Sequence, residues 1–159
     1  IRSMALIHEK LYQSDDFAHI NFKAYTESLI RELQVSFNQV NRTVQFNVDI
    51  QDVELPIDLA VPCGLVVNEL VTNAYKYAFP NNFKGDAVIT VAMKLVDDKV
   101  QLLVQDNGAG MPDSVDPQNA KSLGLTLVKL LVTEQMSGRL SWQLKNGTSC
   151  LIHFSIDEI

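Results

Sequence analysis

The chain has 159 residues, 47% of them hydrophobic, and a formal net charge of −6 at pH 7. This length fits one domain, with room for a short appendage, and can bury a sizeable core. The acidic balance excludes general binding to a phosphate backbone because no block of basic residues offsets it. We therefore expect no nucleic-acid partner.

The cysteines and the apolar runs predict the compartment. Cys63 and Cys150 sit singly, without the spacing of a metal site or a disulfide framework, which favours a reducing compartment. No apolar run approaches the ~18 residues of a membrane span, and no signal peptide is visible, so we expect a cytoplasmic chain without direct membrane contact. The sequence opens at Ile1 inside a helical pattern, which suggests a piece of a longer protein. Whether that protein is membrane-anchored stays open.

The first half of the chain predicts three helices and a strand. Apolar residues at helical spacing indicate helices over residues 1–13 and 22–37. The period then changes to two over residues 44–50, which is typical of a strand. A long helix follows at about residues 60–79, with Pro62 expected in its first turn.

Two strands, residues 86–96 and 99–106, come next and are joined by a tight hairpin. Residues 107–121 hold two glycines, two prolines and little that could pack. A stretch of this length without structure inside a compact domain is usually functional, often a lid.

The chain then predicts a helix over residues 122–136, capped at its C-terminal end by Gly138. Two further strands follow, residues 139–144 and 148–156, around a Lys-Asn-Gly-Thr turn. The sum is an α/β fold: a two-layer sandwich whose mixed, mainly antiparallel sheet packs against helices on one face.

The long helix carries an unusual polar stripe. At 100° per residue, Glu69, Asn73 and Lys76 fall within about 60° of one another, while aliphatic residues cover most of the remaining surface. A plain solvent-exposed face would explain the stripe. A carboxylate, an amide oxygen and an ammonium group in register also suit a metal–phosphate ligand, because Mg²⁺ takes oxygen ligands and keeps several waters.

Two glycine-containing stretches add to this pattern. In "QDNGAGMP", Asp106 can accept a hydrogen bond from a bound donor, and Gly108 and Gly110 let the backbone approach a flat ligand; the same residues also make a good turn. In "KSLGLTLV", a loop leads into a helix start that presents free N–H groups, a suitable anion site. Ser122 as a simple N-cap is the alternative there.

The order and spacing of these stretches resemble a known superfamily. "NELVTNAYKYAF", "DNGAGMP", "SLGLTLV" and "GTSCLIHF" are similar to the N, G1 and G2 boxes and the closing Thr strand of the Bergerat-fold ATPases. That superfamily includes DNA gyrase, heat-shock-90 chaperones, mismatch-repair proteins and sensor histidine kinases. "SMALIHEKLYQS" and "SLGLTLVKLL" look most like the histidine-kinase subfamily whose N box begins Asn-Glu-Leu.

By this resemblance the chain binds ATP and Mg²⁺. Asn73 would coordinate Mg²⁺ and Lys76 would contact phosphates, while Asp106 would bind the adenine amino group. Glu69 occupies the place of the superfamily's hydrolytic glutamate and would join Asn73 at the metal, although the kinase reaction leaves its water-activating role in doubt. The implied nucleotide contacts are Asn73, Lys76, Tyr77, Asp106, Gly108, Gly110, Met111, Ser122, Leu123, Gly124, Leu125 and Thr148.

The G2 stretch departs from the family pattern. Ala120 and Ser122 stand where many kinases have glycines. That departure leaves the contacts of the ATP lid, residues 111–121, uncertain.

The resemblance also implies a domain division. Residues 1–18 would be the C-terminal part of a dimerisation and phosphoacceptor hairpin, and residues 19–159 the ATP-binding domain. His8 imitates a phosphoacceptor motif, but it shares the apolar stripe of Ile1, Met4, Leu11 and Tyr12, so we expect it to be packed. The acceptor histidine would lie on a helix that this sequence does not contain.

The predicted function is therefore that of a protein histidine kinase, dimeric when intact and acting on a response regulator. Two alternatives remain open. One is a Bergerat-type serine kinase, against which the dimerisation-helix similarity weighs. The other is a nucleotide-sensing or dimerising module without catalysis. The stimulus, the sensor domain and the cognate regulator are not readable from the sequence.

Overall fold

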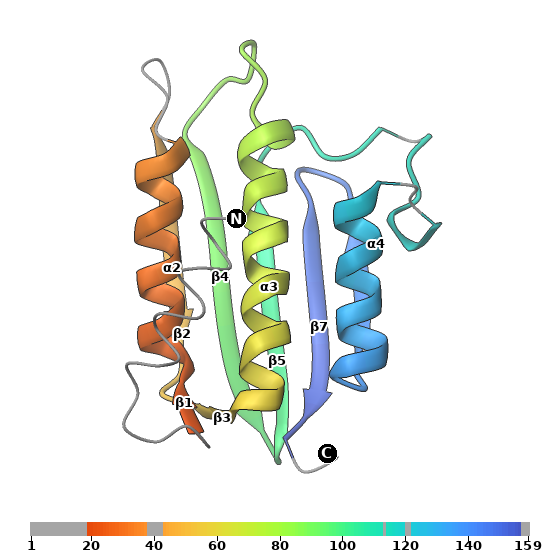
Figure 1. The fold of residues 1–159 in the computed structure, drawn as a ribbon. Helices are drawn as coiled ribbons and strands as arrows, with labels where there is room; N and C mark the ends of the chain where they lie inside the picture. Colours follow the sequence, from red (N-terminus) through yellow and green to blue (C-terminus); the bar gives the residue numbers. More distant parts are fainter. Residues whose placement is uncertain (1–18, 38–42, 113, 120–121, 157–159) are drawn as a thin grey trace.

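The computed structural model describes residues 19–37, 43–112, 114–119 and 122–156. Their centre is a five-stranded sheet in the order β2-β4-β5-β7-β6 (Figure 1). β2 pairs with β4 in parallel, and the other neighbours pair antiparallel. The strands are β2 (Val44–Ile50), β4 (Ala87–Val96), β5 (Lys99–Asp106), β6 (Arg139–Gln143) and β7 (Ser149–Ser155).

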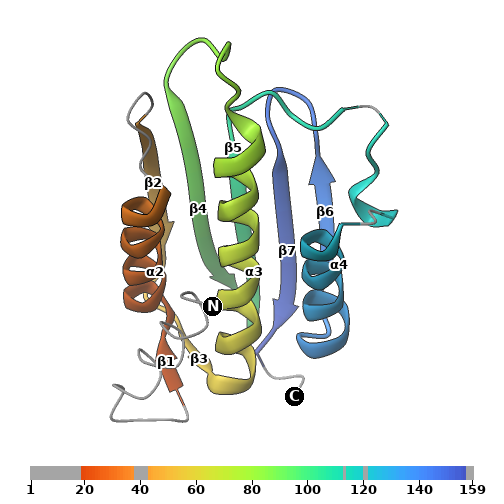
Figure 2. The ribbon, with the colours of Figure 1, turned by 45° about the horizontal axis from the view of Figure 1, so that its top comes forward.

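Three α-helices lie side by side on one face of this sheet: α2 (Phe22–Phe37), α3 (Ile57–Asn73) and α4 (Leu123–Leu130) (Figures 1 and 2). By length and composition Ile57–Ala78 could cross a membrane, yet more than half of its most apolar window is buried inside the protein. This segment is the central core helix of the sandwich. The predicted α/β sandwich with a mainly antiparallel sheet is confirmed.

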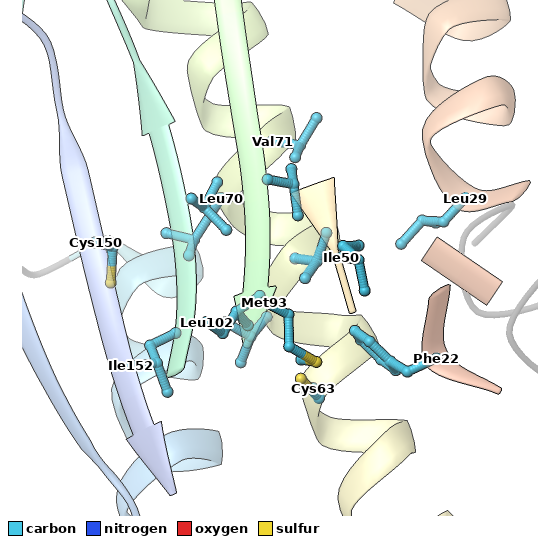
Figure 3. Close-up of a cluster of buried hydrophobic side chains, with 14 of the residues drawn as sticks. Phe22, Leu29, Ile50, Cys63, Leu70, Val71, Met93, Leu102, Cys150 and Ile152 are labelled. Atoms are coloured by element: carbon cyan, nitrogen blue, oxygen red, sulfur yellow. The ribbon is translucent and has the colours of Figure 1, made fainter. Parts of the chain in front are cut away.

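The core fills the space between the two layers (Figure 3). Alternate residues of β4 point toward the helices, so Ile89, Val91 and Met93 are almost fully buried while their neighbours are half-exposed. The helices contribute large side chains such as Phe22 and Leu29. Burial of apolar area on this scale is the main force that holds the helices on the sheet.

A two-stranded ribbon was not predicted from the sequence. β1 (His19–Asn21) pairs antiparallel with β3 (Glu54–Pro56). Both segments are only three residues long, too short for a period-two pattern to show. The ribbon joins the start of α2 to the start of α3.

The ribbon also explains an error at the start of α3. The helix begins at Ile57 rather than near residue 60, directly after β3 ends at Pro56. Pro62 therefore lies in the second helical turn instead of the first. Its missing N–H costs one intrahelical hydrogen bond there. The strand boundaries agree with the predictions to within one residue, and the predicted helix over residues 1–13, with His8, lies outside the described residues.

The C-terminal ends of α3 and α4 differ from the continuous helices that were expected. Each runs on into a π-helical turn, Ala74–Ala78 after α3 and Leu131–Gln135 after α4. The second turn ends with Ser137 in the left-handed region, at φ 50°, instead of the predicted Gly138. Gly138 is one residue further on and donates its N–H to the Val132 carbonyl oxygen at 2.8 Å, which satisfies one of the last carbonyl groups of the turn.

Helices α2 and α3 approach each other closely at Gly64. A Cβ atom at this position would lie 2.5 Å from the Tyr25 hydroxyl oxygen and 2.9 Å from Tyr25 Cζ. Tyr25 is itself buried, at 5% exposure, so its ring has little room to move away. The absence of a side chain at residue 64 sets the spacing of the two helices.

Gly64→Ala is therefore expected to destabilise the domain by about 1–3 kcal/mol through overpacking. Helix propensity alone predicts the opposite sign, because Ala is favoured over Gly in a helix interior by ~1 kcal/mol. The free energy of unfolding from urea titration decides between the two. A stabilised Gly64→Ala variant would contradict the close packing.

Candidate nucleotide-binding site

Four segments that are distant in the sequence meet at one end of the sandwich, at the top of Figure 1. They are the C-terminal end of α3, the end of β5, the first turn of α4 and the loop between β6 and β7. The chain reverses at this end after α3 and after β5. The predicted site residues lie on these segments, so the fold gathers them at one end.

The polar stripe of α3 does not continue unchanged through its end. Glu69 and Asn73 lie within the α-helix and are half-buried. Lys76 and Tyr77 lie on the π-helical turn Ala74–Ala78 and are exposed, Tyr77 at 73%. The ideal 100° step therefore fails beyond Asn73. Single π-helical turns of this kind often occur at functional sites.

Asp106 is the buried acid of the site, with 6% of its surface exposed. Its Oδ1 accepts hydrogen bonds from the backbone N–H of Gly108 at 2.9 Å and of Thr148 at 3.1 Å. Burial raises the pKa of the carboxyl group above its ordinary value, although these two N–H groups act in the opposite direction. The bond to Gly108 makes a local turn, as the sequence allowed, and leaves Oδ2 for another donor.

The loop after β5 docks on the π-helical turn. The N–H of Ala109 donates to the Ala78 carbonyl oxygen at 2.8 Å. A Cβ on Gly108 would collide with that same carbonyl oxygen, so no other residue type fits without displacing the loop. Gly110 follows with φ 76°, a conformation that favours glycine. These contacts tie the acid of β5 to the end of α3.

Gly147 is a site residue that the sequence reasoning missed. It has φ 106°, and a Cβ there would collide with the Asp106 carbonyl oxygen. The next residue, Thr148, also accepts a hydrogen bond from the Asp106 N–H at 2.9 Å, so Thr148 and Asp106 bond in both directions. The Asn-Gly pair before Thr148 is visible in the sequence, but on its own it predicts only a hairpin turn.

The first turn of α4 faces α3. Ser122 is the N-cap, and its Oγ accepts a hydrogen bond from the Leu125 N–H at 3.4 Å, as the simpler interpretation of this serine predicted. A Cβ on Gly124 would lie 2.9 Å from Glu69 Oε2 and 3.9 to 4.0 Å from the amide atoms of Asn73. The carboxylate and the amide therefore converge at the N-terminal end of α4.

The described part of the predicted lid has local structure of its own. Val115 N–H donates to the Pro112 carbonyl at 2.9 Å, and Pro117–Asn119 forms a 3₁₀ turn. Lys129 of α4 donates to the Gln118 carbonyl oxygen at 3.1 Å, which anchors this turn to the helix.

The remaining predicted contacts lie around the same end. Leu123 is 85% exposed on the first turn of α4, and Leu125 in the same turn is buried. Met111 is half-buried at the start of the lid. The structure thus joins Asp106, Gly108 and Thr148 through hydrogen bonds and brings Glu69 and Asn73 to Gly124, whereas Lys76, Tyr77 and Leu123 extend into solvent.

Comparison with known proteins decides the family. Residues 59–158 match the family described as histidine kinase-, DNA gyrase B-, and HSP90-like ATPase. The chain belongs to this family. Residues 1–37 match a second family, described as histidine kinase.

Curated relatives of this ATPase domain are histidine kinases. Blue-light-activated histidine kinase 2 of Erythrobacter litoralis is 27% identical over 113 residues, covering 71% of this chain and 32% of that protein. Sensor histidine kinase PdtaS of Mycobacterium tuberculosis is 26% identical over 158 residues, covering 98% of this chain and 31% of that protein. The chain thus spans about a third of the length of these relatives.

Solved structures show the same fold. The histidine kinase domain of the Erythrobacter litoralis blue-light activated histidine kinase superposes with a TM-score of 0.85 at 21% identity, over 99% of this chain and 73% of that one. The catalytic domain of histidine kinase ThkA superposes with a TM-score of 0.65 at 17% identity, over 87% of this chain and 94% of that one. The fold of this ATPase-family domain is therefore that of histidine kinase catalytic domains.

The buried charge of Asp106 predicts a pH-dependent stability difference. Because the pKa of Asp106 is raised in the folded state, its carboxyl group holds a proton more firmly in the folded chain than in the unfolded chain. The free energy of unfolding therefore falls as pH rises through the folded-state pKa of Asp106. Asp106→Asn removes the buried charge and keeps an oxygen for the N–H groups. We expect its free energy of unfolding to exceed that of the wild type at pH 7, with the difference shrinking toward acid pH.

Urea denaturation across pH 3 to 8 checks this difference. Asp49→Asn, at an exposed position of β2, is the matched control and should stay within ~0.5 kcal/mol of the wild type throughout. An Asp106→Asn variant that is less stable than the wild type at pH 7 would show that the carboxylate stabilises the fold.

Proposed function

We propose that this chain is the ATP-binding catalytic domain of a sensor histidine kinase. The observation that carries the proposal is Asp106. It is a buried carboxylate with one oxygen held by two backbone N–H groups, at the same end of the domain as Glu69, Asn73 and the first turn of α4. Membership of the ATPase family and the histidine kinase relatives support it.

The nucleotide would bind across this end of the sandwich. Asp106 accepts a hydrogen bond from the exocyclic amine of adenine, in a pocket formed by Gly108, Gly110 and Thr148. Met111 and Tyr77 border the base and sugar. A buried carboxylate that is oriented before binding costs little to order, so its hydrogen bond contributes to both affinity and base selectivity.

The phosphates would extend from there toward α4. The N–H groups of its first turn, at Leu123 and Gly124, attract anions, because the helix dipole is positive at this end. Lys76, on the exposed π-helical turn, supplies the positive charge from the opposite side, and Ser122 precedes the first turn. Residues 111–121 would cover the nucleotide.

The residues present fit a magnesium ion. Glu69 Oε2 and the Asn73 amide converge near Gly124, and both residues offer oxygen ligands. Among the described residues no three His, Cys, Asp or Glu side chains gather as a metal site, which agrees with an ion that relies on few protein ligands, waters and phosphates. When bound, Mg²⁺ would neutralise charge on the phosphates.

The reaction is transfer of the γ-phosphoryl group of ATP to a histidine. The bond between the γ-phosphorus and the ADP oxygen breaks, a bond to an imidazole nitrogen forms, and ADP leaves. Catalysis consists mainly of positioning and charge neutralisation, to which Lys76 and the first turn of α4 contribute. The acceptor would be a histidine on a helix that this sequence does not contain, and residues 19–159 would form the catalytic domain.

The intact protein would be a homodimer that passes the phosphoryl group to a response regulator, with this part in the cytoplasm. A serine kinase of the same fold is the alternative, and labelling of a response regulator rather than a serine substrate separates the two. The match of residues 1–37 to a histidine kinase family favours the histidine kinase.

The metal assignment predicts the behaviour of Asn73→Ala. Calorimetric titration with a non-hydrolysable ATP analogue should show tighter binding by the wild type with Mg²⁺ than without it. We expect Asn73→Ala to lose this enhancement, about tenfold, because an amide ligand of the ion is gone. Asn47→Ala, at an exposed position of β2, is the control and should keep it. Equal Mg²⁺ dependence in Asn73→Ala and wild type would contradict the assignment.

Because His8 is expected to be packed rather than to accept a phosphoryl group, we predict that this chain binds ATP without phosphorylating itself. Incubation with γ-labelled ATP should leave no acid-labile label on the chain, including on His8. Titration of the same preparation with the ATP analogue provides the control for a functional pocket. Acid-labile phosphate on His8 would show that this residue, and not one on a missing helix, is the acceptor.

A further inference from the structure

Asn107 lies between two site residues, Asp106 and Gly108, and has no assigned role in the proposed site. It is exposed, and an Asp-Asn-Gly sequence is a common turn, so a solvated turn residue would be the default interpretation. The amide group of this side chain is nevertheless hydrogen-bonded to the protein. Both ends of the amide bond to the backbone at the start of β4.

The side-chain oxygen of Asn107 replaces a backbone oxygen in the sheet. β4 and β5 are paired up to Ile89 and Asp106, and the next pair in this register is Val88 with Asn107. The Asn107 N–H donates to the Val88 carbonyl at 3.2 Å, as in a normal ladder. The Val88 N–H, however, donates to Asn107 Oδ1 at 2.8 Å rather than to the Asn107 carbonyl.

Because Asn107 Oδ1 takes the place of the Asn107 carbonyl oxygen, the main chain of β5 can leave the sheet one residue after Asp106. The chain can then turn so that Gly108 N–H reaches Asp106 Oδ1 and Ala109 N–H reaches the Ala78 carbonyl. The Nδ2 group of Asn107 donates to the Asp86 carbonyl at 2.7 Å, which also ties the loop before β4 to this turn.

We infer that Asn107 is a positioning residue for nucleotide recognition. Its Oδ1 takes the place of the backbone carbonyl opposite Val88 and thereby holds Asp106 and Gly108 in the orientation that binds the adenine amine. Asn107 need not touch the nucleotide. The inference rests on the proposed function, because Asp106 must be the group that recognises the base.

The test compares binding of ATP and of inosine triphosphate, in which a carbonyl oxygen replaces the amine. The wild type should prefer ATP by at least about tenfold, since inosine triphosphate places an acceptor oxygen, in place of the donating amine, against the buried Asp106 carboxylate. Asn107→Ala should reduce that ratio at least about threefold, because Asp106 is no longer held toward the amine. A general loss of stability would weaken both nucleotides alike and leave the ratio unchanged.

Two further variants make the test specific. Asn107→Asp keeps an oxygen for Val88 N–H but loses the Nδ2 donor to the Asp86 carbonyl, so it should reduce the ratio less than Asn107→Ala does. Asn82→Ala, at an exposed position of the loop before β4, is the control and should leave both affinities unchanged. If Asn107→Ala does not fold, Asn107→Gln, whose amide lies one methylene further out, is judged by the same ratio.

The outcomes separate the two levels of the proposal. A wild type that does not prefer ATP overturns the adenine assignment of Asp106, and with it this inference. A wild type that prefers ATP, together with an unchanged ratio in Asn107→Ala, overturns the role of Asn107 alone. A loss in Asn107→Asp as large as in Asn107→Ala overturns the role of Oδ1.

Discussion

The site depends on the contact between the end of α3 and the loop after β5. The carbonyl group of Ala78 belongs to a π-helical turn and accepts the Ala109 N–H, while Gly108 lies too close to that carbonyl to carry a side chain. This contact joins the helix that carries Glu69 and Asn73 to the strand that carries Asp106. The contact therefore fixes the two halves of the proposed site relative to each other.

The end of the molecule that carries the proposed site contains features that lower the stability of the fold. A carboxylate at Asp106 is buried in spite of the cost of desolvation, and the N–H groups of Gly108 and Thr148 offset only part of that cost. Gly147 and Asn146 add turns in the left-handed region, the second without the freedom of glycine. Burial of the apolar core between the helices and the sheet offsets this unfavourable free energy. Such unfavourable features tend to collect at functional sites.

The fold could be predicted from the sequence where the pattern was long and regular. The strands at residues 86–96 and 99–106 alternate clearly, and their hairpin is closed by Asp97 and Asp98, both with positive φ. The ribbon of β1 and β3 could not be predicted, because three-residue strands have no measurable period. The π-helical turn at Ala74–Ala78 was hidden for another reason: its residues continue the helical pattern of α3, and nothing in that pattern distinguishes a π-helical turn from an α-helix. The proposed site could be located from its motifs, and the Asn-Gly pair indicated a turn at Gly147. The contact of Gly147 with Asp106 and the role of Asn107, however, depend on contacts between strands that no local pattern reveals.

The electrostatics of the first turn of α4 connect the proposed metal to the proposed phosphate site. Glu69 Oε2 lies close to Gly124, where the positive end of the helix dipole favours a negative group. A triphosphate that binds the same N–H groups would bring several negative charges against that carboxylate, within a few ångströms and partly shielded from water. Like charges at this distance repel strongly. Their coexistence requires a cation between them, and the nearby amide oxygen of Asn73 completes an oxygen ligand set for it. Binding of nucleotide and of Mg²⁺ should therefore be coupled in this domain, with each ligand increasing the affinity for the other by the same factor.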